Sequence, residues 1–220
     1  MNGRKLFAFA CVGAAVAAML LGTMAIADPP QEPKITGQPE FKLPPGWTEA
    51  DFQACLLAGT PGKEHEHLAQ GVGVWDCKTT MWMAPGTEPM QSGGTMTVTS
   101  VMDGRYTKCE IKGEIPGMGP YLASGVYGFD NVSRKFVATF IDNHSTGIMT
   151  GTGELSKDGK TLTWKYTYNC PITKKPTVMR EIETITGPDT RTLVAFGIDP
   201  KSGKEFQMMS VEMTRKKTGS

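Results

Sequence analysis

The stretch Leu162-Thr163-Trp164-Lys165-Tyr166-Thr167-Tyr168 decides the fold class of this protein. Large apolar side chains alternate in it with threonine and lysine, which is the period of two expected for a strand with one buried face. Asp158-Gly159 stands just before the stretch and is a typical hairpin turn. The stretch therefore predicts an antiparallel strand that enters from a tight turn.

The same pattern extends in both directions, from Val72 to the end of the chain. Turn signals such as Asp103-Gly104, Asp130-Asn131 and Gly187-Pro188-Asp189 recur about every 10–15 residues. Strands are predicted at about 72–83, 92–102, 105–114, 120–129, 134–142, 146–155, 160–169, 176–187, 190–198 and 204–216. Because no long helical period interrupts them, the sequence predicts an all-β fold, an antiparallel up-and-down β-barrel of about ten strands.

The alternation also predicts which side chains face the interior. On the first strand these are Trp75, Cys77, Thr79, Met81 and Met83, and on the last they are Met209, Val211, Met213 and Arg215. The strand at 120–129 is apolar on both sides, so its faces stay unassigned. The faces of Glu181 and Glu183 also stay unassigned, because both faces of their strand carry apolar residues. Met179 and Ile185 share the face of the two glutamates, and Ile182 is on the other face with Arg180.

The first 27 residues have the pattern of a secretory signal peptide. Arg4 and Lys5 precede an uncharged run over residues 6–27, which ends in Ala25-Ile26-Ala27. An uncleaved membrane anchor is the alternative, since the run is long enough to span a bilayer. We expect a secreted protein of the bacterial periplasm with no membrane span after cleavage.

Three further segments follow the signal peptide. Residues 28–46 contain six prolines and are predicted to be an extended linker. Residues 47–70 are predicted to be a short helical segment, in which Thr48 is the N-cap and Asp51 its capping-box partner. Residues 71–220 form the predicted β-barrel domain.

Charge and cysteine content exclude several classes of protein. The 23 Lys and Arg residues nearly balance the 22 Asp and Glu residues, so the chain has no charge excess of the kind that nucleic-acid binding requires. Four cysteines remain after the signal peptide: Cys55, Cys77, Cys109 and Cys170. Disulfides are possible in an exported chain, and the spacing does not choose among the three pairings. No Cys-x-x-Cys motif occurs, so a thioredoxin-like or zinc-ribbon fold has no support.

Short motifs link the chain to a known family. Gly73-Val74-Trp75, with Arg215 on the last strand, is similar to the pattern of calycins, the lipocalin and nitrobindin-like barrels. There, a cation from the last strand packs over the tryptophan. The longer motifs at 61–65, 73–76, 82–90, 128–131 and 140–142 resemble the bacterial family called domain of unknown function 1579. The resemblance covers about residues 61–216 and implies a calycin-like barrel, but no activity and no catalytic residue.

The barrel interior is the predicted site of function. An up-and-down barrel of this size leaves room for one small ligand. We expect it to bind a small hydrophobic or amphipathic molecule, with burial of apolar area as the driving force. The predicted ligand-binding residues are Trp75, Met81, Met83, Trp164, Tyr166, Met213 and Arg215.

Other functions stay open. An enzyme using the same cavity would take Glu154, Asp142 or His144 as its acid or base. An envelope interaction protein would dock through the linker and a helix carrying Trp47, Phe52 and Leu56. Periplasmic binding of Cu(I) would use the thioethers of Met81, Met83 and Met90.

No cofactor and no other metal site are predicted. His65 and His67 lie two positions apart on a helical turn, so they point in different directions and do not form a shared zinc site. A haem-binding barrel of the nitrobindin kind needs an axial histidine on a late strand. No histidine follows His144.

Overall fold

The computed structural model describes residues 42–217, so the predicted signal peptide and most of the linker lie outside the described residues. The elements are α1 (Glu49–Ala58), α2 (Lys63–Ala69), β1 (Gly73–Met81), β2 (Met90–Val101), β3 (Tyr106–Ile115), β4 (Gly119–Asp130), β5 (Lys135–Asp142), β6 (Met149–Leu155), β7 (Thr161–Asn169), β8 (Pro176–Gly187), β9 (Thr190–Ile198) and β10 (Glu205–Arg215). Within this part of the chain, no helix has the length and hydropathy needed to cross a membrane.

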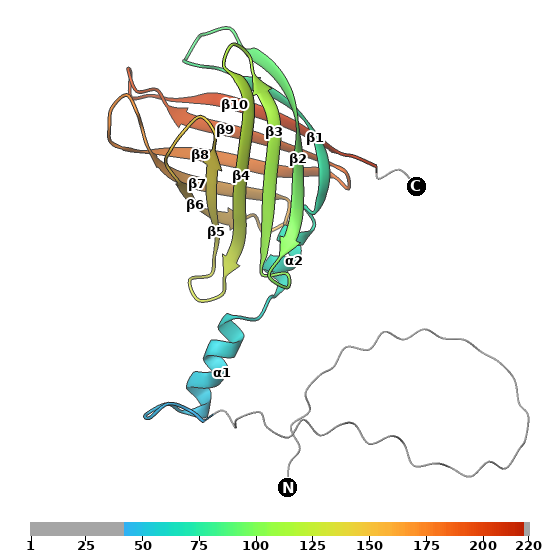
Figure 1. Ribbon diagram of the computed structural model, residues 1–220, viewed down its shortest axis with the longest axis vertical. Helices are drawn as coiled ribbons and strands as arrows, with labels where there is room; N and C mark the ends of the chain where they lie inside the picture. Colours follow the sequence, from blue (N-terminus) through green and yellow to red (C-terminus); the bar gives the residue numbers. More distant parts are fainter. Residues whose placement is uncertain (1–41, 218–220) are drawn as a thin grey trace, which may run out of the picture. The chain divides into compact units, whose positions relative to one another are not determined.

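The ten strands form one closed antiparallel barrel (Figure 1). Each strand pairs with its neighbours in sequence, and β1 closes the ring on β10 from Trp75 opposite Arg215 to Met81 opposite Met209. Closure leaves no strand edge with unpaired backbone groups. The predicted all-β fold, an up-and-down barrel of about ten strands after a short helical segment, is confirmed.

The helix α1 begins and ends at identifiable contacts. The Thr48 hydroxyl accepts a hydrogen bond from the backbone of Asp51, and the Asp51 carboxylate accepts one in return, which is the predicted capping box. After the helix, the Asn131 side chain donates to three backbone carbonyls, of which that of Thr60 is nearest at 2.8 Å. Trp47 and Leu56, predicted as docking residues, are about half exposed.

The register settles the faces that the sequence left open. On β4, Ala123 and Phe129 are buried inside the barrel, whereas Leu122 and Val126 are exposed outside. The predicted inward set of β10 is confirmed by its pairing with β1, although a bulge at Met208 interrupts the ladder with β9. The prediction that Met83 faces the interior is wrong. The chain leaves the sheet after Met81, so Met83 lies outside the barrel and is 67% exposed.

Aromatic rings form the buried core. Trp164 stacks on Tyr166 at 5.7 Å between ring centroids, and it meets the edges of Tyr127 at 5.5 Å and Phe136 at 6.3 Å. Gly153 on the neighbouring strand β6 leaves room for the Trp164 ring, because a Cβ atom at that position would lie 2.8 Å from the ring. The alternating pattern that predicted β7 thus also builds the centre of the core.

Candidate functional site

One end of the barrel is closed by Trp75 and Arg215. The Trp75 side chain is fully buried, and its indole N–H donates to the carbonyl of Gly71 at 2.9 Å. The Arg215 guanidinium lies 4.1 Å above the indole ring, as the calycin resemblance implies. It also donates to the backbone carbonyls of Gln70 and Val72, and so ties the chain before β1 to the end of β10.

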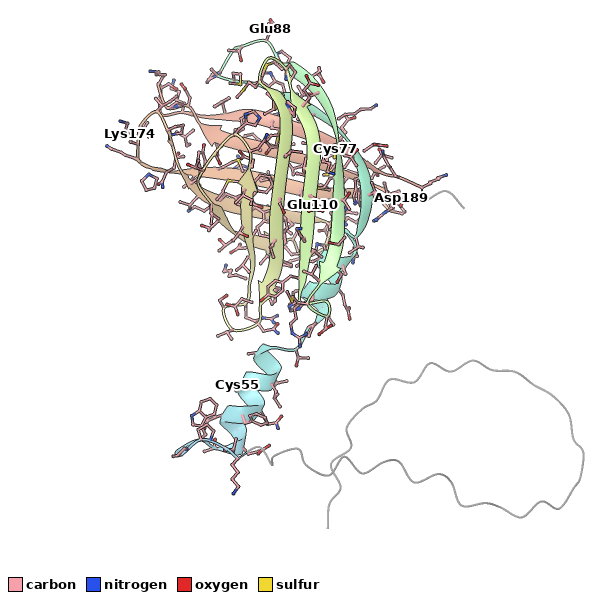
Figure 2. The ribbon with its side chains drawn as sticks, in the orientation of Figure 1. Cys55, Cys77, Glu88, Glu110, Lys174 and Asp189 are labelled. Carbon is pink, nitrogen blue, oxygen red and sulfur yellow. The ribbon has the colours of Figure 1, made fainter. Side chains whose placement is uncertain are left out.

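Arg215 is also held by the turn between β8 and β9. Its Nε donates to a carboxylate oxygen of Asp189 at 3.1 Å, and Figure 2 labels Asp189 in that turn. Gly73 makes the arrangement possible. Its φ is +140°, and a Cβ atom there would lie 2.6 Å from a nitrogen of Arg215. The guanidinium therefore acts as a structural clamp at this end.

The helix α2 lies at the same end of the barrel (Figure 1). His65 is buried and meets the edge of Phe129, and its Nδ1 accepts a hydrogen bond from the backbone of Gly62. His67 meets Phe136 instead, so the two imidazoles are not brought together. Burial lowers the pKa of His67, because the charged form loses its hydration there, and the nearby Arg191 lowers it further. These histidines help to cover the barrel end.

Side chains do not fill the interior completely. Ile111, Tyr127, Leu193 and Val211 all face inward by register, and each keeps part of its surface accessible. Buried aromatic residues surround this space toward the closed end, and smaller or flexible side chains lie toward the other end. The interior therefore has an apolar wall that a small molecule can contact.

A group of charged side chains lies in this wall. Glu181 and Glu183 are both on the inward face of β8, opposite Trp164 and Leu162 on β7. Glu183 accepts a hydrogen bond from Arg191 of β9 at 2.6 Å, and both side chains of this ion pair are largely buried. The Arg191 guanidinium lies 5.3 Å from the centre of the Trp75 ring.

Glu181 differs from Glu183 because it has no such partner. Among the described residues, none forms a hydrogen bond or ion pair with its carboxyl group. Burial raises its pKa to about 8, and the negative charge of Glu183 contributes to the shift. At neutral pH the Glu181 carboxyl is therefore mostly protonated, and it faces the interior of the barrel.

Polar groups from three other strands surround Glu181. Tyr127 and Tyr166 interact through their hydroxyls, and the thiol of Cys109 lies 3.9 Å from the Tyr127 hydroxyl. Burial raises the pKa of each of these groups, and the charge of Glu181 adds to it. The indole N–H of Trp164, on the strand paired with Glu181, is buried and finds no partner among the described residues. An unpaired buried donor costs about 1–3 kcal/mol.

The residues predicted to bind a ligand occupy different parts of the barrel. Trp75, Met213 and Arg215 lie at the closed end, whereas Trp164 and Tyr166 lie in the wall that carries Glu181. Met81 is at the other end of β1. Met83 does not face the interior at all. Six of the seven predicted residues thus line or close the same barrel.

The methionines toward that other end form a soft apolar surface. Met81 is paired with Met90 on β2 and with Met209 on β10, and all three face inward. The predicted Cu(I) site loses one of its three ligands, because Met83 is outside. In residues 42–217, no three His, Cys, Asp or Glu side chains gather in a metal-ligating cluster.

Of the acid and base candidates drawn from the sequence, Asp142 is on the inward face at the end of β5, in register with Ala123, where its carboxylate accepts a hydrogen bond from the backbone of His144, whereas the other two are not in the interior. Glu154 is exposed on the outer face, where it pairs with Lys135. His144 is exposed in the turn after β5 and stacks on Tyr121 at 5.9 Å. The inward-facing carboxyls opposite the core residues Trp164 and Leu162 are Glu181 and Glu183, which are partly buried. One feature of the sequence could have identified them. Two glutamates stand two positions apart on one predicted strand, and the next predicted strand carries an arginine that could pair with one of them.

All four described cysteines are free thiols. Cys55 is exposed on α1, Cys77 lies in the barrel wall (Figure 2), Cys109 is buried and Cys170 is in the turn after β7. Two surface hollows lie elsewhere, one of about 310 Å³ beside Trp82 and Phe206 and one of about 160 Å³ beside His65. Neither includes Glu181.

The family can now be stated. The model of the family described as "Protein of unknown function (DUF1579)" matches residues 60–215, from the turn before α2 to Arg215. The chain belongs to this family. A comparison with curated protein sequences gives no match.

Solved structures share the barrel of this DUF1579 protein. The S-type phycobiliprotein lyase CPES from Guillardia theta superimposes with a TM-score of 0.53 at 11% identity, over 75% of this chain and 98% of the lyase. Rv2717c from M. tuberculosis does so with a TM-score of 0.53 at 14% identity, over 72% of this chain and 100% of its own. At these identities the similarity concerns the fold.

Proposed function

We propose that this DUF1579 protein binds a small amphipathic molecule inside its barrel. One observation carries the proposal: the interior is lined by aromatic and apolar side chains that remain partly accessible, and it contains a carboxyl group with no partner among the described residues. A protein core ordinarily pairs its buried polar groups. A ligand that fills the space would pair these groups and bury apolar surface.

Apolar burial supplies most of the binding energy in this proposal. Each 100 Å² of apolar surface removed from water contributes about 2.5 kcal/mol. Tyr127 offers a flat ring that is partly accessible, and Met81 and Met209 offer flexible thioethers that adapt to the shape of a ligand. Two solved structures have the same fold, and one of them is a phycobiliprotein lyase. They support the view that a barrel of this kind can carry a functional site.

We also propose that the protein acts outside the cytoplasm. Support comes from the sequence, where a basic start, an uncharged run and Ala25-Ile26-Ala27 precede the linker. Amino-terminal sequencing of the protein recovered from a periplasmic fraction tests this. A mature chain that begins at Asp28 is expected, and a chain that keeps Met1 and is recovered from the cytoplasmic fraction would contradict the proposal.

The binding proposal is tested with N-phenyl-1-naphthylamine, a neutral probe whose fluorescence rises in apolar surroundings. We expect saturable binding by the protein. Val211→Trp places a large ring inside the barrel, because Val211 faces inward, and should weaken binding at least tenfold, or about 1.4 kcal/mol. Glu212→Trp puts the same ring on the exposed outer face of β10 and should leave binding within about twofold.

Thr79→Trp is the second lumen variant, since Thr79 faces inward on β1 next to Val211. Circular dichroism and gel filtration show whether each variant keeps the fold. If folded Val211→Trp and Thr79→Trp both bind the probe as the wild type does, the ligand is not bound in the barrel and the proposal is refuted.

A further inference from the structure

Glu181 has an unusual position among the charged groups of the barrel interior. The groups that interact with it electrostatically are Glu183 on the same face of β8, the hydroxyls of Tyr127 and Tyr166 and the thiol of Cys109. Arg191 is already bound to Glu183 at 2.6 Å. The second cation of this region, Arg215, is held by Asp189 and by backbone carbonyls.

The part of the interior opposite Trp164 and Leu162 therefore has two carboxyl groups, Glu181 and Glu183, for the one guanidinium of Arg191. Within the described part of the chain, no cation is within ion-pair distance of Glu181. The Glu183 carboxylate on the same strand face makes the surroundings of Glu181 negative, so the electrostatic potential favours a positively charged group there and disfavours a second anion.

The neighbouring side chains suit a cation as well. Trp164, stacked on Tyr166, is paired with Glu181 between β7 and β8, and Tyr127, which keeps part of its surface accessible, packs edge-to-face with Trp164. Aromatic faces attract cations, as the protein itself shows where Arg215 lies 4.1 Å above Trp75. The buried N–H of Trp164 in this wall also has no hydrogen-bond partner among the described residues, and as a donor it would pair with an acceptor atom of a ligand and not with its ammonium group.

We infer that the ligand of the barrel is an organic amine, a molecule with an apolar body and one protonated nitrogen that pairs with the Glu181 carboxylate. This inference rests on the proposed function, because it names the ligand class for the same interior. The apolar body contacts the aromatic and methionine wall. The ammonium N–H groups donate to the Glu181 oxygens.

Binding of such an amine is coupled to release of a proton. The Glu181 carboxyl is mostly protonated at neutral pH, and it gives its proton to the buffer when the ammonium group arrives. The amine keeps its own proton, so the net change is one proton released for one cation bound. A neutral or anionic ligand of the same length would release none from this group.

The test compares three molecules with one chain length: decylamine, decanol and decanoate. Each competes with N-phenyl-1-naphthylamine at pH 7. The wild type should prefer decylamine to decanol by about tenfold, and decanoate should bind most weakly. Glu181→Gln keeps the shape of the side chain but cannot ionise, so the preference for decylamine over decanol should disappear.

Glu110→Gln is the matched control. Glu110 is exposed on the outer face of β3, where it pairs with Lys108, and Figure 2 labels it on the barrel wall. This variant should keep the full preference for the amine. Calorimetry in phosphate and in Tris counts protons from the difference in measured heat. The wild type should release close to one proton with decylamine, and Glu181→Gln should release none.

The outcomes separate the two proposals. If neither the probe nor any decyl compound binds, binding inside the barrel is refuted. If the probe and decanol bind but the amine has no advantage, or keeps its advantage in Glu181→Gln, the amine inference is wrong and lumen binding stands. An amine advantage without proton release would also exclude Glu181 as the paired group.

Discussion

The buried carboxyl of Glu181 makes stability depend on pH in a direction opposite to that of most paired carboxylates. In the unfolded chain, this group titrates near its ordinary value of 4.5, whereas in the fold its pKa is about 8. Below pH 4.5 both states hold the proton and the contribution to stability is complete. As the pH rises toward 8, the unfolded state has lost its proton and the folded state must give up its own, so this stability disappears.

The magnitude follows from the two pKa values. Between them, the free energy of unfolding falls by about 1.4 kcal/mol for each pH unit. From pH 5 to pH 8 the loss from Glu181 is about 3–4 kcal/mol, since the slope flattens as the folded state begins to titrate. Glu181→Gln has no proton to lose at this position. The free energy of unfolding of this variant should therefore lack the decrease with pH that Glu181 causes in the wild type.

The assay is urea unfolding of the wild type and of Glu181→Gln at pH 5, 6, 7 and 8, in the presence of a reductant. The difference in unfolding free energy between them cancels other titrating groups, including His67. It should shift by about 3 kcal/mol in favour of the variant over this range. Glu212→Gln, on the outer face of β10, should show no such shift. If the Glu181→Gln difference changes by less than about 0.5 kcal/mol, the argument that Glu181 holds a proton in the fold is refuted.

Two further predictions concern the closed end and the thiols. Gly73→Ala should cost about 2–3 kcal/mol in urea unfolding, because its Cβ would lie 2.6 Å from Arg215 at a φ of +140°, whereas Gly86→Ala, with open space around it, should cost about 1 kcal/mol; equal losses would contradict the clamp. Hydrogen bonds lower the pKa of Cys170 and burial raises that of Cys77 to about 11, so a disulfide reagent at pH 7 should modify Cys170 more than tenfold faster. Mass mapping of the labelled peptides measures both rates, and a faster Cys77 would show that the barrel wall opens.

The strand pattern was accessible from the sequence because a strand's faces alternate with a fixed period. Trp164 and Tyr166 could be placed inside from their neighbours alone, and the pairing of Arg215 with Trp75 was implied by the family resemblance. The end of the first strand was not accessible in this way. The alternation continues to Met83, but the chain turns away after Met81, since β2 begins its pairing opposite that residue.

What the sequence determined by itself was the fold class and the family, because these depend on local periodicity and on motifs contiguous in the chain. The tertiary structure alone decided the candidate site. Glu181 and Glu183 were ambiguous on their own strand, and only the pairing of β8 with β7 and β9 turns them inward. Whether a carboxyl is buried, paired or left without a cation depends on side chains from strands far apart in sequence, which closure of the barrel brings together.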